Sequence, residues 1–485
     1  MPHKPTQSSP QLVSTGHQLA AQAAASLLKK GGSAVDAAIA ADAVMGVVEP
    51  MATSIGGDVL AMIAQPGQDV VSYNGTGKSP AGLDASLVEA LPGSRIPERH
   101  PLSVTVPGAV RGWWDLHQRY GKLDWSVLFD DAIECAEQGY ILGRIAASEW
   151  KLFDFALHAQ DECAQLYQAG NPPAAGTQLN NKELAGVLKM IKEQGPDPFY
   201  EGWIPKAAGD AVQSMGGVLD AADFAPHQGF FTQPLSADFY GAQVYQCPPN
   251  THGVAILDAL TDIAQADLDP YDPVSWQRVI EYTAAALDSA SQTVADPAGN
   301  TVCTVVVDDD GLAITLMSSV FKRFGSGIVV PGAGFCLQNR GFGFSEPGHI
   351  NGPAPNKRPY HTVIPGITMR DQDFYLGMGV VGGLMQPQGQ IQILTRVLAW
   401  NQQLQDALDA PRWRLESHNT LAIEAGWPSE FEPAMRAAGY GQPHQSAGEL
   451  GGRSDFGGAH AVMRNAQGML IGAADKRKDG AWLTA

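Results

Sequence analysis

The chain has 485 residues, 44% of them hydrophobic, and a formal net charge of −19. This length suits one large domain or two to three ordinary ones. The negative charge argues against nucleic-acid or anionic-membrane partners, and no apolar run of about 18 residues predicts a membrane-spanning helix.

Cysteines and histidines are not arranged as in a disulfide framework or a metal site. The five cysteines include no Cys-x-x-Cys pair, and no His-Glu-x-x-His motif occurs. Residues 74–79 resemble the end of a phosphate-binding loop, but Ser72 stands where its first glycine belongs. We therefore expect no metal and no cofactor. The first residues lack an apolar segment of the signal-peptide type, which predicts a cytoplasmic protein.

The first fifty residues predict two helices rich in small side chains. Residues 17–29 favour a helix that a glycine pair ends. Ser33 and Asp36 resemble a capping box that starts a second helix, which ends before Pro50. Because alanine dominates both segments, the two helices can pack closely against each other or against a sheet.

The next part of the chain predicts a change from strands to helices. Strands are expected at 58–65 and 70–74. Residues 110–290 are expected to be mostly helical, with one helix over 276–292.

A β-hairpin is predicted after a turn-like stretch at 296–300. Two apolar, β-rich runs, 301–307 and 312–317, flank the turn Asp308-Asp309-Asp310-Gly311. Strands and glycine-rich loops then dominate to about residue 383. With no repeat or long linker, the whole chain is expected to form one compact domain with helices and sheets.

Short motifs follow one another in a fixed order along nearly the whole chain. They are Gly31-Gly32-Ser33-Ala34-Val35-Asp36-Ala37-Ala38, Gly46-Val47-Val48-Glu49-Pro50, Ile55-Gly56-Gly57, Val106-Pro107-Gly108, Phe324-Gly325-Ser326-Gly327, Leu337-Gln338-Asn339-Arg340, Lys357-Arg358-Pro359-Tyr360, Gly382-Gly383 and Asp409-Ala410-Pro411-Arg412-Trp413. Each is weak alone. In this order they resemble the γ-glutamyltransferase (glutathione hydrolase) family of N-terminal-nucleophile hydrolases, in a form with an altered glutamate pocket.

The resemblance implies a fold and a maturation step. The fold is an α+β, four-layer α-β-β-α sandwich with two central antiparallel sheets. In this family the precursor cuts itself immediately before a threonine that opens a β-strand, and Thr301 matches that threonine. Cleavage between Asn300 and Thr301 would give a large subunit, 1–300, and a small subunit, 301–485, which stay intertwined in one domain.

Thr301 would supply both the nucleophile and its base. A threonine hydroxyl is a poor nucleophile without a base. The α-amine freed by cleavage has a pKa near 7.7–8.0 and is partly unprotonated at neutral pH. Before cleavage that amine is held in a peptide bond, so the precursor is expected to be inactive.

The resemblance also assigns supporting residues. Ser319 matches a hydroxyl residue that hydrogen-bonds near the nucleophile. Gly382 and Gly383 match the glycine pair whose backbone N–H groups form the oxyanion hole, where such donors stabilise the transition state by roughly 3–4 kcal/mol.

The residues that bind glutamate in the family are mostly replaced here. Thr76 stands at the position of the arginine that holds the α-carboxylate. Phe321 and Gly343 stand where an asparagine and an aspartate hold the α-amino group, and His361-Thr362 replace a serine pair. The nucleophile machinery is therefore expected to be kept, while the recognition of glutamate is not.

Two residues have open roles in the altered pocket. Arg340 can bind a substrate carboxylate from another direction, or it can be a structural ion-pair residue. His361 can line the pocket together with Thr362 and Thr76, or it can cap a loop. Cys303 is a candidate thiol nucleophile, but a small buried strand residue is the preferred interpretation.

The sequence leaves three functions open. The first is a self-processing amidase for γ-glutamyl amides of the glutathione type, with water or an amine as acceptor. The second is an amidase for another small molecule, such as oxamate or an acylated β-lactam. The third is an unprocessed binding or scaffold protein, because Val302 and Cys303 replace the usual threonine and histidine after the nucleophile. Whether the chain forms homo-oligomers is not decided by the sequence.

Overall fold

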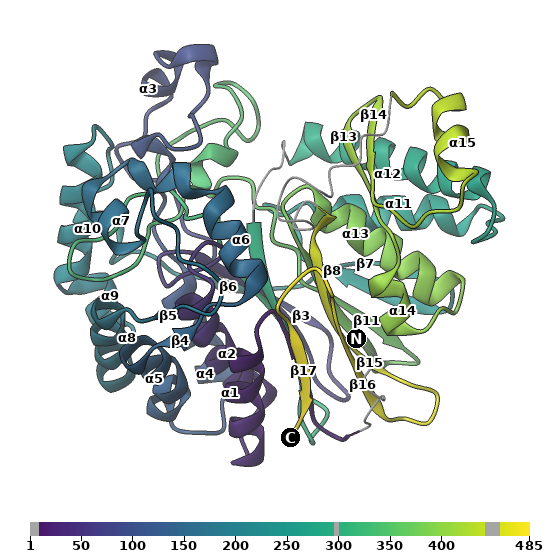
Figure 1. The fold of residues 1–485 in the computed structure, drawn as a ribbon, viewed down its shortest axis with the longest axis horizontal. Helices are drawn as coiled ribbons and strands as arrows, with labels where there is room; N and C mark the ends of the chain where they lie inside the picture. The colour runs from purple at the N-terminus through teal and green to yellow at the C-terminus, as the bar shows by residue number, and fades with distance from the viewer. Residues whose placement is uncertain (1–8, 295–299, 442–455) are drawn as a thin grey trace.

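Two antiparallel sheets lie face to face at the centre of the protein (Figure 1). The computed structural model describes residues 9–294, 300–441 and 456–485. The first sheet has the strand order β17 (Ala481–Thr484), β1 (Leu12–Thr15), β9 (Asn300–Val307), β10 (Ala313–Phe321), β2 (Asp58–Ala64), β3 (Val71–Asn74) and β6 (Phe230–Thr232). The second has the order β16 (Leu470–Ala474), β15 (Gly458–Arg464), β12 (Asp373–Val381), β11 (Gly366–Arg370), β8 (Ala242–Gln246) and β7 (Leu235–Phe239).

Helices cover the outer face of each sheet (Figure 1). On the side of the first sheet lie α1 (Gln18–Lys29), α2 (Ala34–Val48), α3 (Ala85–Glu89), α4 (Ala109–Tyr120), α5 (Asp130–Gln138), α6 (Arg144–Leu152), α7 (Asp161–Leu166), α8 (Lys182–Gln194), α9 (Asp197–Glu201) and α10 (Trp203–Ser214). On the side of the second lie α11 (Gly253–Ala264), α12 (Pro273–Thr293), α13 (Met385–Leu394), α14 (Leu404–Asp409) and α15 (Phe431–Ala437). Two small hairpins complete the fold, β4 (Tyr140–Ile141) with β5 (Gln178–Leu179) and β13 (Trp413–Ser417) with β14 (Thr420–Ile423). The predicted α-β-β-α sandwich is confirmed.

The two N-terminal helices form as their sequences predict. Ser33 accepts a hydrogen bond from the Asp36 N–H, and the Asp36 carboxylate accepts one from the Ser33 N–H, so the predicted capping box is present. All residues of α2 are buried, because its small side chains let it lie between α1 and the strands β9 and β10.

The middle of the chain is mostly helical, as predicted, but it also contains strands that the sequence did not reveal. Among these strands, β7 and β8 pair at the edge of the second sheet. Their side chains alternate between more and less buried positions, which is the period of a strand with one covered face. A period-2 pattern this short is a weak signal in a sequence with helical segments on both sides of it.

Among the helices in the described ranges, none is long and apolar enough to cross a membrane.

Each sheet is built from both sides of the Asn300–Thr301 bond. In the first sheet, β9 lies between β1, from the N-terminal part, and β10. In the second sheet, β8 from the N-terminal part pairs with β11. The predicted division into 1–300 and 301–485 would therefore leave two chains that share both sheets.

Glycines in β12 let the two sheets approach closely at β9. A Cβ atom at Gly379 would lie 2.6 Å from Cys303 Sγ and 2.6 Å from Met317 Sδ. A Cβ atom at Gly377 would lie 2.8 Å from Val305 Cγ1. Only residues without side chains leave room for the two sheets at this spacing.

We expect Gly379→Ala to destabilise the fold. The added methyl group must push the sheets apart or displace both sulfur atoms, and overpacking of this kind costs roughly 1–3 kcal/mol. Urea unfolding would measure the loss. Gly186→Ala in α8 is the control, because a Cβ there meets nothing within 4 Å and alanine is the better helix former by about 1 kcal/mol. A Gly379→Ala midpoint equal to or above that of the parent would contradict the close approach.

Candidate active site

Thr301 lies at the start of β9 with its side chain toward the second sheet. Side chains alternate along a strand. Val302 and Val306 belong to the core under α1 and α2, whereas Cys303 and Val305 belong to the core between the sheets. Thr301 shares the face of Cys303 and is 1% exposed. The candidate nucleophile is therefore buried at the end of the space between the sheets.

One side chain contacts the Thr301 hydroxyl directly. The Nε2 atom of Gln386 donates a hydrogen bond of 2.7 Å to Thr301 Oγ1. Gln386 is in the first turn of α13. Sequence reasoning missed this residue, because a polar residue in a helix is usually exposed.

The glycine pair Gly382-Gly383 connects β12 to α13. Gly377 of β12 faces Val305 of β9, and Gly379 faces Cys303. Two residues further along β12 and two residues back along β9, the end of β12 therefore lies level with Thr301. The pair has φ angles of +112° and +61°, which favour glycine.

The backbone donors of this turn are unused. Within the described residues, neither N–H of the glycine pair is hydrogen-bonded to another residue. The turn thus has the donors that an oxyanion hole requires, at the level of Thr301. That role remains a prediction.

Ser319 lies beside Thr301 in a bulge of β10. Ser318 pairs with Val302 and Phe321 pairs with Asn300, so two residues of β10 are opposite Thr301. Ser319 is the first of these two. Its Oγ accepts hydrogen bonds from the Phe321 N–H, at 2.8 Å, and from Arg340 Nη2, at 3.2 Å.

Asp58 is a buried carboxylate that the sequence analysis did not single out. It starts β2, directly opposite Ser319. Its Oδ1 accepts hydrogen bonds of 2.8 Å from the Gly77 N–H and from Gln338 Nε2, and its Oδ2 lies 3.3 Å from His361 Nε2. Burial raises the pKa of Asp58, but His361, Arg340 and Gln338 together lower it below the ordinary value.

Arg340 is buried next to this carboxylate without a direct ion pair to it. Its guanidinium donates to Ser319 and, at 3.4 Å, to the Thr362 hydroxyl. It also stacks 4.1 Å from the centre of the Phe321 ring. Burial lowers the pKa of Arg340 to about 9, against the opposing effect of Asp58, so it stays charged at neutral pH. Its Nε has no hydrogen-bond partner among the described residues.

The predicted pocket residues converge on Asp58. His361 contacts it, and Thr362 is bound to Arg340. Thr76 precedes Gly77, and its hydroxyl donates to Asn74 Oδ1 at 2.7 Å, so this hydroxyl is engaged within its own loop.

Phe321 and Gly343, which stand where the family holds the α-amino group of glutamate, also lie close together. A Cβ atom at Gly343 would be 3.9 Å from the Phe321 ring. Neither a phenylalanine nor a glycine has a carboxylate that could bind an amino group.

Cys303 is a buried residue of a strand, which was the preferred interpretation of its sequence. Its side chain lies between the sheets against Gly379. Burial raises the pKa of its thiol well above the ordinary value, and the charge of Asp42 adds to this effect. A thiol that stays protonated is a poor nucleophile.

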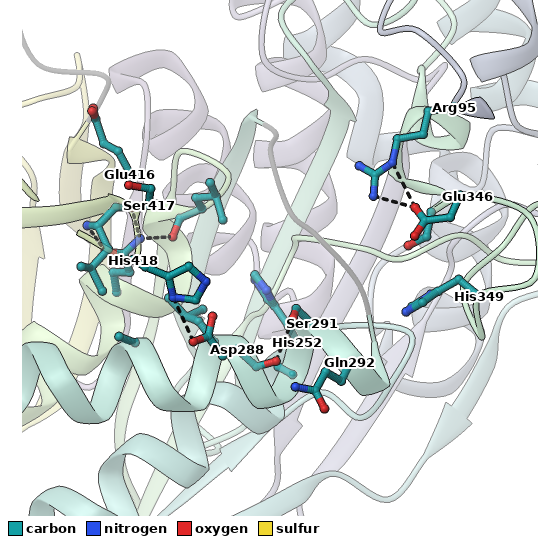
Figure 2. Close-up of a pocket in the computed structure, with 17 residues that line it drawn as sticks. Arg95, His252, Asp288, Ser291, Gln292, Glu346, His349, Glu416, Ser417 and His418 are labelled. Carbon is teal, nitrogen blue, oxygen red and sulfur yellow. Dashed lines mark hydrogen bonds and ion pairs between the residues drawn. The ribbon is translucent and has the colours of Figure 1, made fainter. Parts of the chain in front are cut away.

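A cavity of about 480 Å³ reaches the first turn of α13 (Figure 2). Leu384 and Gln388 line the cavity, and they stand two residues before and two residues after Gln386 in the sequence. Its walls carry the ion pairs Arg95–Glu346 and His418–Asp288. His252 also lines it; its Nδ1 contacts the Tyr360 hydroxyl, and its Nε2 has no partner among the described residues. Burial lowers the pKa of His252 to about 3, so the ring is neutral. The cavity is of the size that holds small molecules.

We expect His361 to be neutral in the folded protein. Burial, with the charge of Arg340, lowers its pKa from 6.5 to about 4, although Asp58 opposes this. Between pH 6.5 and 4 the unfolded chain binds a proton at this histidine that the folded chain does not bind. The residue therefore decreases stability as pH falls through that window, by at most about 1.4 kcal/mol per pH unit.

His361→Gln removes this titration. In urea unfolding, the stability advantage of the parent over the variant should be constant above pH 6.5 and should shrink toward pH 4. An advantage that grows on acidification would show instead that Asp58 and His361 hold the proton as an ion pair.

Comparisons with known proteins point to one family. The family model described as gamma-glutamyltranspeptidase matches residues 20–302 and 295–485. The oxamate amidohydrolase proenzyme of Klebsiella pneumoniae is 30% identical, over 96% of this chain and 96% of its own. The glutathione hydrolase-like YwrD proenzyme of Bacillus subtilis is 29% identical, over 97% and 98%.

A solved structure matches over the whole fold. The crystal structure of cephalosporin acylase from Bacillus halodurans has a TM-score of 0.92 and 28% identity, and the match covers 100% of this chain and 98% of that one. The chain therefore belongs to the γ-glutamyltranspeptidase family and has the fold of its N-terminal-nucleophile hydrolases.

Proposed function

We propose that the protein is the precursor of an amidohydrolase that cuts itself between Asn300 and Thr301. The observation that carries this proposal is the position of the Thr301 hydroxyl. It is buried at the start of β9, level with the unused N–H groups of Gly382 and Gly383. The names of the similar proteins, several of them proenzymes, support the same conclusion.

Maturation and turnover use the same oxygen atom. In maturation, Thr301 Oγ1 attacks the carbonyl carbon of Asn300, the peptide bond becomes an ester, and water hydrolyses the ester. In turnover, the freed α-amine of Thr301 takes the hydroxyl proton while Oγ1 attacks the substrate amide. The proton leaves with the amine product, and water, or an amine in transfer, releases the acyl group from Thr301.

The substrate class follows from the charges beside the nucleophile. Arg340 is a buried cation, and among the described residues its hydrogen bonds go to the hydroxyl groups of Ser319 and Thr362. Such a cation can donate charge-assisted hydrogen bonds to a carboxylate. We therefore propose an amide whose acyl part carries a carboxylate close to the scissile bond, and we place the amine part in the cavity of Figure 2.

A γ-glutamyl group is the weaker candidate for the acyl part. It carries an α-amino group besides its carboxylate, and Phe321 and Gly343 provide no acid for that group. Oxamate, which is the substrate named for the Klebsiella relative, has a carboxylate and no α-amino group. A glutaryl amide has the same character with a longer chain.

Thr301→Val should abolish both self-cleavage and amidase activity, because it replaces the hydroxyl by a methyl group of similar size. The parent chain of 51.3 kDa should give fragments 1–300 and 301–485 on a denaturing gel, with a new amino terminus at Thr301. Thr304→Val is the matched control: this buried threonine of the same strand bonds to Thr15, and its loss should leave cleavage intact. A parent chain that stays whole would instead support an unprocessed binding protein.

Arg340→Lys should reduce activity selectively toward acyl groups that carry a carboxylate. A lysine keeps the charge but loses the planar set of donors, and a charged hydrogen bond of roughly 1.5–3 kcal/mol corresponds to about 10–100-fold in kcat/KM. Oxamate and oxamide are a matched pair, because oxamide replaces the carboxylate by an uncharged amide. Equal losses on both would assign Arg340 to the structure and not to the substrate. Glutathione, γ-glutamyl-p-nitroanilide and a glutaryl amide complete the panel.

A further inference from the structure

Helix α13 carries four buried glutamines at every second position, Gln386, Gln388, Gln390 and Gln392. Gln388 and Gln392 each donate to and accept from backbone groups of β13, at Leu415 and Trp413. Gln390 donates to the Ile364 carbonyl and accepts from Gln246. These three hold backbone segments in place. Gln386 is different, because it donates to the Thr301 hydroxyl.

The orientation of the Gln386 amide is fixed by its second contact. Its Oε1 accepts a hydrogen bond of 3.3 Å from the Ile364 N–H. A backbone N–H can only donate, so the atom facing Ile364 must be the amide oxygen. The atom that faces Thr301 is then the NH2 group, which can only donate. The Thr301 oxygen is therefore an acceptor in this contact, and its own proton must point elsewhere.

We propose that Gln386 is a catalytic residue that stabilises Thr301 Oγ1 as the leaving group when an ester at Thr301 is hydrolysed. The inference rests on the proposed function. A donor placed on the nucleophile does not help attack, because it withdraws electron density from the oxygen. The same donor becomes stronger as negative charge develops on that oxygen during ester cleavage.

The step balances without any further reactant. Water adds to the ester carbonyl carbon, and the α-amine of Thr301 takes one proton from that water. The bond between the carbonyl carbon and Oγ1 then breaks, and its electron pair goes to Oγ1, which the Gln386 N–H stabilises. The ammonium returns the proton to Oγ1, and Gln386 keeps its own protons throughout.

Hydrolysis of an ester at Thr301 occurs both in maturation and in each catalytic turnover. The first ester joins Asn300 to Thr301 Oγ1 during maturation, and the α-amine is already free at that point. The second is the acyl-enzyme of each turnover. Gln386 would thus assist the ester hydrolysis that completes both maturation and turnover.

Maturation offers a test that needs no substrate. Gln386→Met removes the donor, and Gln386→Glu removes it while keeping an acceptor for the Ile364 N–H. Gln392→Met is the control from the same helix, because it loses three buried backbone contacts but none to Thr301. Each purified chain is incubated with and without neutral hydroxylamine, a stronger nucleophile than water that cleaves esters and not ordinary peptide bonds.

We expect cleavage of both Gln386 variants to slow by about 10–100-fold and hydroxylamine to restore it, with a hydroxamate on Asn300 in the mass spectrum. Gln392→Met should mature at nearly the parent rate, and Thr301→Val should resist hydroxylamine. Parent-like maturation of the Gln386 variants would overturn the inference. So would a folded Gln386 variant that stays whole with hydroxylamine. If the parent itself does not cleave, the proposed function fails first.

The turnover step has its own readout on the hydroxylamine-matured proteins. With p-nitrophenyl acetate as an acylating probe, the Gln386 variants should release close to one p-nitrophenolate per site in a burst, followed by slow release. The small subunit should then carry an added acetyl mass. Loss of the burst together with the slow phase would place Gln386 in acylation and contradict its role on the leaving group.

Discussion

The site depends on the need to compensate one buried charge, the carboxylate of Asp58. An isolated carboxylate in a protein interior is strongly unfavourable unless donors and a countercharge surround it. Here the Gly77 N–H, the Gln338 amide, His361 and Arg340 provide them. These four groups come from three separate segments, because Gln338 and Arg340 are only two residues apart. The charge of Asp58 therefore holds these three segments together next to Ser319.

Thr301, the proposed nucleophile, is positioned by the sheets. The absence of side chains at Gly377 and Gly379 sets the distance between β12 and β9. That distance places the end of β12, the glycine turn and the start of α13 at the same level as Thr301. Donors on rigid elements need little reorganisation when charge develops, which is the condition for electrostatic stabilisation of a transition state. In the proposed function the acyl group is bound mostly by residues of loops, and the sequence departs from the family pattern in those loops.

The sequence predicted the local features and missed those that depend on tertiary contacts. The capping box of α2 and the hairpin of β9 and β10 could be predicted, because both are determined by residues close in the chain. Asp58 looked like the first residue of a strand, and nothing near it in the sequence shows that His361 faces it. Gln386 could not be found either, since its role depends on a strand that lies 85 positions earlier. The alternation of four glutamines in one helix was the signal available: polar residues at every second position line more than one face of a helix.

The shared sheets also bear on when the proposed cleavage could occur. A chain cut before folding would leave β9 without β1, and β8 without β11, and each half would present open strand edges of the kind that promote aggregation. If the bond is cut as proposed, we expect the cut to follow folding, because only the closed sheets hold both halves in place. The two halves produced as separate chains would each expose these strand edges, whereas the same division made in the folded protein leaves both partners paired.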